Sequence, residues 1–392
     1  MNNQFQEDFF LKFVLIPFTA IASPVSFVLA QGWSRSRAVL NSFEFGSFPT
    51  VTSKTYIKRD SILQKIISKL MPHPTSCLYH LIVGEHGTGK STLLIQACHK
   101  VRKGVVYVSV PENVGAFGRE IGKAFNFKYD EHVSLKAYFN SILGEAFPRP
   151  SGTSPIELFQ RLNVFINEAA AAYTAKHGIP PVLIIDNINW LALRDREMLE
   201  VLQDYAKIHA DKGDLVIVFV SSDGNGPVIL RDRSSFSRCD KSILEIGDIP
   251  DEDAIKHLIA TCKIKEESAS YLVAQVTGGR FQLLNECISQ IREGKTDQQI
   301  KNDTYYSVIT EFEKCGINPK SVIGRSDFHS LFKKLLEEKV VKGRDVGQLI
   351  QDRNLRNRVI SHNIFSCKLL GGDITFQSRA VENYVRVSKI II

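Results

Sequence analysis

Four short segments of the chain are apolar at almost every position, and helical patterns lie between them. The segments are LYHLIV (78–83), VVYVSV (105–110), PVLIID (181–186) and LVIVFVSS (215–222). Strands that do not alternate apolar with polar residues are typical of a parallel sheet covered by helices on both faces. We therefore predict an α/β fold, with one sheet domain spanning residues 51–245.

Helical periodicity supports this arrangement. Residues 61–70 place their isoleucines and Leu70 on one face, as expected for a helix that packs on a sheet. Ser154 followed by Pro155 is a typical helix start, and Gly178 is a typical helix end. We predict a helix between these signals. Residues 33–55 are rich in Ser and Thr and are interpreted as a linker.

The N-terminal residues 13–30 form an uncharged run, FVLIPFTAIASPVSFVLA. Eighteen uncharged, mostly apolar residues are close to the minimum for a membrane-spanning helix, so a mitochondrial or other membrane anchor is one interpretation. A cleaved targeting segment and a buried hydrophobic arm are the alternatives. Seven cysteines without CxxC spacing indicate free thiols and an intracellular protein, which is cytoplasmic unless this run anchors it.

The composition narrows the class of protein. The chain has 392 residues, of which 44% are hydrophobic and 23% charged, which excludes a disordered, collagen-like or multi-span membrane protein. Residues 317–392 contain 14 Lys and Arg but 7 Asp and Glu, so this region alone carries an excess equal to the net charge of +7. A basic module suggests nucleic acid or an acidic membrane surface as partner, although a solvated basic face explains it equally well.

A glycine-rich segment follows the first apolar segment. Residues 84–91 read GEHGTGKS and match GxxxxGK[ST] in the strand–loop–helix context that the motif requires. Glycines allow successive N–H groups to point at phosphate oxygens, and the helix N-terminus adds partial positive charge. We expect the side chain of His86 to be solvated. The residues expected to bind the nucleotide are Gly84, Glu85, His86, Gly87, Thr88, Gly89, Lys90, Ser91 and Thr92.

The motif also assigns individual roles. Lys90 is expected to reach the β- and γ-phosphates, and the Ser91 hydroxyl is expected to bind Mg²⁺. Asp186 ends the third apolar segment and is expected to hold the same metal ion. These residues predict ATP and Mg²⁺ as ligands. The sequence contains no NKxD-like element, which favours adenine over guanine.

Other residues are candidates for the hydrolytic step. Asn187 occupies the position where many ATPases have a glutamate that polarises the attacking water, and an amide accepts no proton, so we expect slow hydrolysis. Glu85 is either a substitute base or a solvated acid. Ser222, at the end of the fourth apolar segment, is expected to contact the γ-phosphate or the water. Arg233 is the candidate arginine finger.

Taken together, these motifs resemble the AAA+-related P-loop ATPases, including STAND and archaeal-type members and a group of fungal P-loop ATPases. The segment YIKRD (56–60) is similar to the box that precedes the P-loop in this family, and TGGR (277–280) is similar to an element of its helical lid. The resemblance implies that Arg59 and Arg280 contribute to the nucleotide site. It also implies a helical lid at 246–318 and a winged-helix-like domain at 319–392, with residues 1–50 as a separate N-terminal segment.

Two functions remain open. The first is a nucleotide-driven switch or slow ATPase, in which ATP binding and hydrolysis to ADP and phosphate change the arrangement of core, lid and winged helix. The second is a nucleic-acid-binding protein that uses ATP as a structural ligand, with the basic residues of the C-terminal domain on the phosphates. Expected partners are ATP, a protein client and further copies of the chain, and the resemblance identifies no client.

Overall fold

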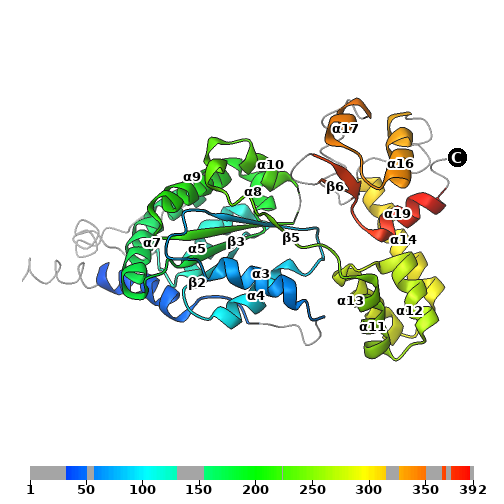
Figure 1. The fold of residues 1–392 in the computed structure, drawn as a ribbon, viewed down its shortest axis with the longest axis horizontal. Coiled ribbons are helices and arrows are strands. Elements are labelled where there is room, and N and C mark those ends of the chain that lie inside the picture. Colours follow the sequence, from blue (N-terminus) through cyan, green and yellow to red (C-terminus); the bar gives the residue numbers. More distant parts are fainter. Residues whose placement is uncertain are drawn as a thin grey trace, which may run out of the picture.

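The computed structural model describes residues 32–50, 57–129, 154–222, 224–314, 326–349, 364–367 and 372–388. A sheet covered by helices is followed by a second, mainly helical region (Figure 1). No helix within these ranges is long and apolar enough to cross a membrane. Residues 13–30 lie outside the described ranges, so the three interpretations of that run stay predictions.

The sheet has five parallel strands in the order β2-β3-β4-β1-β5. The strands are β1 (His80–Val83), β2 (Val105–Ser109), β3 (Val182–Asp186), β4 (Val216–Ser221) and β5 (Leu244–Glu245). Ser109 pairs in register with Asp186, and Ser221 pairs with Val83. The polar ends of β2, β3 and β4 therefore meet at one edge of the sheet, where the loop after β1 begins.

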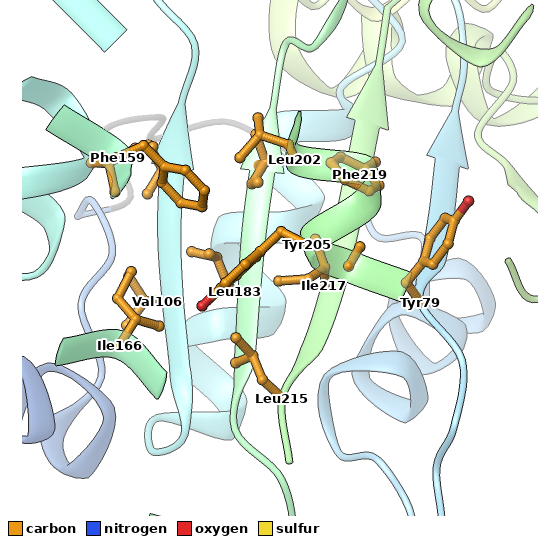
Figure 2. Close-up of a cluster of buried hydrophobic side chains, with 14 of the residues drawn as sticks. Tyr79, Val106, Phe159, Ile166, Leu183, Leu202, Tyr205, Leu215, Ile217 and Phe219 are labelled. Carbon is orange, nitrogen blue, oxygen red and sulfur yellow. The ribbon is translucent and has the colours of Figure 1, made fainter. Parts of the chain in front are cut away.

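Helices cover both faces of the sheet, as the uniformly apolar strands predict. One face carries α3 (Asp60–Leu70) and α4 (Lys90–Val101). The other face carries α5 (Phe117–Ala124), α7 (Pro155–His177), α8 (Asn189–Arg194), α9 (Arg196–Lys212) and α10 (Asn225–Arg231), with the short turns η2 (Val114–Ala116) and η3 (Ser234–Arg238). Successive strand residues face opposite sides, so Leu183 joins the cluster of Figure 2 while Ile184 packs toward α4. The predicted α/β sheet is confirmed.

The predicted capping of α7 is present. The Ser154 hydroxyl accepts a hydrogen bond from the backbone N–H of Glu157, and the Glu157 carboxylate accepts one from the N–H of Ser154. This reciprocal pair satisfies two donors that a helix N-terminus otherwise leaves open. Gly178 ends the helix in the left-handed conformation, with φ at 73°. Both boundaries therefore lie where the sequence signals put them.

The linker prediction for residues 33–55 is wrong over much of its length. Residues 32–45 form a helix in which Val39 and Phe43 are fully buried against the sheet domain. The Phe43 ring packs edge-on against Phe125, with 5.4 Å between the centroids. Ser47 then forms a parallel bridge with Val106 on β2. The apolar i, i+4 pair places one face of this helix in the core, and the many serines do not prevent it.

After β5 the chain is helical. The lid region consists of α11 (Asp251–Cys262), α12 (Glu266–Leu272), the π-helical η4 (Val273–Thr277), α13 (Phe281–Arg292) and α14 (Asp297–Lys314). It has its own apolar cluster, to which α14 contributes Ile300. The C-terminal end of α14 instead contributes Phe312 to the next cluster. This helix therefore packs in both clusters, and it ends before the boundary predicted near residue 318.

The C-terminal region contains helices and an antiparallel hairpin, as predicted. Its elements are α16 (Ser326–Glu338), α17 (Gly343–Leu349), β6 (Phe365–Cys367), β7 (Ile374–Phe376) and α19 (Arg379–Val387). Val341 adds an antiparallel bridge to Ile374 of the hairpin. Residues 350–363 lie outside the described ranges. The assignment of a winged helix therefore stays a prediction, as do the domain boundaries.

Candidate functional site

The loop between β1 and α4 has the geometry of a phosphate-binding loop. Gly89 precedes α4 with φ at +87°, a left-handed conformation that is costly for other residues, and α4 begins at Lys90. The Lys90 side chain is only 4% exposed, and its Nζ donates a hydrogen bond to Glu85 O at 2.7 Å across the loop. An ammonium held over a helix N-terminus in this way is suited to a polyphosphate.

Arg59 supports this loop from outside the motif. It lies directly before α3, its Nη1 donates to Thr88 O at 3.1 Å, and its Nη2 donates to Gly247 O at 2.9 Å. The guanidinium thus connects the phosphate loop to the segment that leads from the sheet to the lid. The structure places Arg59 beside the site, as the sequence predicts, but in contact with the loop backbone.

The two predicted metal-binding residues lie in direct contact. Ser91 Oγ donates a hydrogen bond to Asp186 Oδ2 at 2.6 Å, and the Asp186 side chain is fully buried at the end of β3. The backbone N–H of Asn187 donates to the other carboxylate oxygen at 2.8 Å. A hydroxyl and a carboxylate offer the hard oxygen ligands that Mg²⁺ prefers, so this pair fits a magnesium ion beside Lys90.

Tyr107 on β2 also contacts Asp186, and no sequence motif predicted it. Its hydroxyl donates to Asp186 Oδ2 at 2.5 Å. Burial and the Asp186 carboxylate raise the pKa of Tyr107, so the phenol keeps its proton and acts as a donor. Tyr107 belongs to an apolar strand and to no motif. The sequence offered one indication of this contact: segments 105–110 and 181–186 were both predicted to be strands of one sheet, so residues of the first could lie beside Asp186.

Asn187 and Ser222 lie together at the edge of the sheet. Asn187 adopts φ of +61°, its Nδ2 donates to Ser109 Oγ at 3.0 Å, and its Oδ1 accepts from Ser222 Oγ at 3.5 Å. The backbone N–H of Ser222 points to Asn189 Oδ1 at 3.4 Å. These groups form a neutral polar network next to Lys90 and Ser91. They can orient a water molecule, but none of them is a base at neutral pH.

His86 is not the solvated loop residue that the sequence suggested. It is partly buried between the phosphate loop and the lid, and it lines the cleft beside Lys90. Burial and the nearby cations Lys90 and Arg280 lower the pKa of His86 to about 4. Its imidazole is therefore neutral at physiological pH and adds no charge to the site.

Acidification is expected to destabilise the fold through His86. Its pKa is about 4 in the folded protein and about 6.5 in the unfolded chain. Between these values the unfolded state binds more protons, so stability is complete above about pH 6.5 and decreases toward about pH 4. From about pH 7 to pH 5, the wild type is expected to lose about 2 kcal/mol more than His86→Gln. Urea unfolding measures both losses, and equal losses would contradict the assignment.

Glu85 contacts the C-terminal region, which neither interpretation of its side chain predicted. Its half-buried carboxylate accepts a hydrogen bond from the Ser366 hydroxyl on β6. The phosphate loop thereby contacts the C-terminal hairpin directly. Gln282, in the first turn of α13, donates its backbone N–H to Gly87 O at 3.0 Å. Lid and hairpin therefore both lie against residues 85–87.

Arg280 connects three regions of the molecule. Its Nη1 donates to His86 O at 2.7 Å, and its Nε donates to Asp248 Oδ1 at 2.5 Å. Its Nη2 donates to Gln377 O at 2.5 Å beyond β7. The preceding Gly279 allows this close packing, because a Cβ there would lie 1.6 Å from Ile249 O. Arg280 is 4% exposed and binds the phosphate loop through a carbonyl.

A cleft of about 400 Å³ lies over the phosphate loop. Its lining includes the predicted residues His86, Gly87, Gly89, Lys90, Ser91, Thr92, Asn187 and Ser222. The lid closes its other side with Phe281, Gln282, Asn285 and Glu286. A smaller, mainly apolar pocket of about 20 Å³ shares Gly89, Thr92 and Phe281 with the cleft, and Ile57, Leu93 and Ile249 also line it. The polar cleft has room for the phosphates of a nucleotide, whereas the small pocket has room for little more than a water molecule.

The structure does not bring Arg233 to this cleft. Its Nη1 pairs with Glu200 at 2.8 Å and its Nη2 with Asp204 at 2.7 Å, both on α9. Two carboxylates close to one guanidinium hold it on the side of the sheet domain. The arginine-finger prediction therefore has no support from the geometry within one chain. Arg353, Arg356 and Arg358 lie outside the described residues, so the nucleic-acid prediction for the basic region stays a prediction.

Comparisons with known proteins agree with this geometry. Residues 57–218 match the family described as the AAA ATPase domain. The Walker-type ATPase of Pyrococcus abyssi is similar over 88% of this chain and 99% of its own, with a TM-score of 0.53 and 13% identity. The ORC2 protein of Aeropyrum pernix, solved as ADPNP–ADP complexes, is similar over 87% of this chain and 97% of its own, with a TM-score of 0.47 and 12% identity. No curated protein matches the sequence significantly.

The match with the AAA ATPase domain covers most of the sheet domain. The matched segment contains Arg59, the whole phosphate loop and Asp186. At 13% identity, the Pyrococcus abyssi structure shows a shared fold and does not transfer an activity. Residues 57–218 match the AAA ATPase domain, and the resemblance of this chain to the AAA+-related P-loop ATPases is confirmed.

Proposed function

We propose that the protein binds Mg·ATP between the sheet domain and the lid, hydrolyses it slowly, and uses the bound nucleotide to control the arrangement of lid and C-terminal region. The observation that carries this proposal is the contact of Ser91 Oγ with Asp186 Oδ2 at 2.6 Å, beside the buried Lys90. Lys90 and Ser91 belong to α4 and Asp186 to β3, and all three lie at the N-terminal end of α4. That combination is suited to a metal-bound polyphosphate.

The lining of the site is suited to a nucleotide. The phosphates would lie over the loop amides and Lys90, and the base would lie toward the apolar side chains of Ile57, Leu93 and Phe281, where the small pocket would have to widen on binding. Mg²⁺ held by Ser91 and Asp186 would neutralise charge on the β- and γ-phosphates. Asn187 and Ser222 can orient a water but cannot deprotonate it, so the expected turnover is slow.

The contacts of the loop supply the basis for a switch. The lid donates to Gly87 O through Gln282, the hairpin contacts Glu85 through Ser366, and Arg280 bonds to His86 O. A phosphate group that enters the loop adds negative charge next to Glu85 and competes for the same donors. The state of the nucleotide therefore acts on contacts that hold the lid and C-terminal region in place.

Replacing Arg280 by alanine is expected to uncouple these regions. The variant loses the bonds that join His86 O, Asp248 and Gln377 O, so the lid and hairpin separate from the loop whether or not nucleotide is present. Small-angle X-ray scattering of the full chain, with and without Mg·ATP, measures the change. The wild type is expected to show a nucleotide-dependent radius of gyration, and Arg280→Ala is expected to show the same radius in both conditions.

A matched control lies on the same helix. Arg292 ends α13 and is exposed. Arg292→Ala should therefore keep the nucleotide-dependent difference of the wild type. A difference that persists unchanged in Arg280→Ala, or that is absent from the wild type despite bound ATP, would contradict the switch and leave an ATP-binding protein without this coupling.

A further inference from the structure

Tyr107 contributes a hydroxyl to the metal end of the site from a strand that carries no motif residue. It is the third residue of β2 and pairs in register with Ile184, two positions before Asp186. The ring packs in the cluster between the sheet and α4, together with Leu94 and Cys98, and the side chain is 8% exposed. From this position the hydroxyl reaches along the sheet to the carboxylate at the end of β3.

The Asp186 carboxylate has a donor on each oxygen. Oδ1 accepts from the N–H of Asn187, and Oδ2 accepts from both Ser91 Oγ and Tyr107 OH, at 2.6 and 2.5 Å. If Ser91 becomes a ligand of Mg²⁺, its hydroxyl turns toward the metal ion. Of these two side-chain donors, Tyr107 is then the one that still holds Oδ2 in place.

We propose that Tyr107 is a positioning residue for magnesium, which orients the Asp186 carboxylate through its hydroxyl so that metal-bound nucleotide finds a preorganised acceptor. The inference rests on the proposed function. Ligating carboxylates are commonly fixed by outer-shell donors, and loss of such a donor typically costs about 10–100-fold in metal affinity. Without the Tyr107 donor, Oδ2 of the buried carboxylate has no protein donor once Ser91 binds the metal ion, and only the Asn187 N–H still fixes the group through Oδ1.

A purely structural role for Tyr107 predicts a different result. The ring itself fills space between β2 and α4, and that packing is retained in Tyr107→Phe, which removes only the oxygen atom. If packing were the whole role, the variant would bind nucleotide and metal as the wild type does. If the hydroxyl positions Asp186, only the response to magnesium changes.

The experiment measures binding of a fluorescent ATP analogue to the full chain, first in EDTA and then as Mg²⁺ is titrated. For Tyr107→Phe, affinity in EDTA is expected to stay within about twofold of the wild type, while the Mg²⁺ concentration that gives half of the tightening rises about tenfold. The matched control is Tyr205→Phe. Tyr205 is equally buried, but its hydroxyl donates to Asn167 at 2.8 Å on the other face of the sheet.

Each outcome decides the proposal. A shift in Tyr107→Phe but not in Tyr205→Phe supports it. Unchanged magnesium dependence overturns it, and so does an equal loss of binding in EDTA and in magnesium, which indicates a general structural role. If the wild type binds no nucleotide, the proposed function itself fails. If the wild type binds equally well with and without Mg²⁺, the metal assignment and the role of Tyr107 both fail.

Discussion

Lys90→Ala is expected to reduce the affinity for Mg·ATP by about 100-fold or more, which corresponds to about 3 kcal/mol. The Lys90 ammonium is 4% exposed and donates to a carbonyl of the loop, Glu85 O. A buried, charged donor makes strong hydrogen bonds to phosphate oxygens. Alanine at this position removes the cation that lies nearest to the triphosphate. Competition against a fluorescent ATP analogue measures the loss.

The control for this prediction uses another lysine of the same helix. Lys100 lies in the last turn of α4 and is exposed. Lys100→Ala removes the same charge from the same element, so it should keep the affinity of the wild type. If Lys90→Ala and Lys100→Ala bind the nucleotide equally well, the phosphates do not occupy the loop.

The second large effect is an expected increase in the rate of ATP hydrolysis. Asn187→Glu should raise the rate of phosphate release by about 100-fold, because it places a carboxylate, which can accept a proton, beside the site for the attacking water. The position lies next to Ser109 and Ser222 and one residue after Asp186. Its φ of +61° adds a backbone cost of about 1 kcal/mol for glutamate, which reduces stability but leaves the carboxylate in the site.

Asn187→Gln is the control that distinguishes the effect of a proton-accepting carboxylate from the effect of a longer side chain. Glutamine has the length of glutamate and the same backbone cost, but its amide accepts no proton. Its turnover should remain close to that of the wild type under saturating Mg·ATP. Equal rates for the glutamate and glutamine variants would show that the absence of a carboxylate at position 187 is not what limits hydrolysis.

Sequence signals predicted the helices and strands that are determined by interactions between residues close together in the chain. The strand before Gly84 and the helix from Lys90 follow from an apolar run and a glycine turn, and the cap at Ser154 follows from hydrogen bonds within one turn. The helix at 32–45 was missed because its burial depends on contacts with distant residues such as Phe125 and Tyr173. A serine-rich composition indicates an exposed segment only when the segment has no apolar face that packs against another part of the protein.

The residues of the site also fall into those that local motifs predicted and those that depend on contacts between distant segments. The Walker-type loop and Asp186 were found because the chemistry requires certain residues at a fixed spacing. Tyr107 and Ser366 were missed, since each reaches the site from another strand, and one sequence does not show which residues pair across a sheet. The ion pairs of Arg233 were missed for a related reason, because its two acidic partners lie about a helix turn apart on α9, far from it in the sequence.

The proposed nucleotide site is tested most directly by a crystal structure of the full chain with Mg²⁺ and a non-hydrolysable ATP analogue. We expect a triphosphate over the amides of residues 84–91, with Lys90 on its β- and γ-phosphates and a metal ion at Ser91 and Asp186. An analogue bound elsewhere, or a phosphate loop that stays empty at millimolar nucleotide, would contradict it.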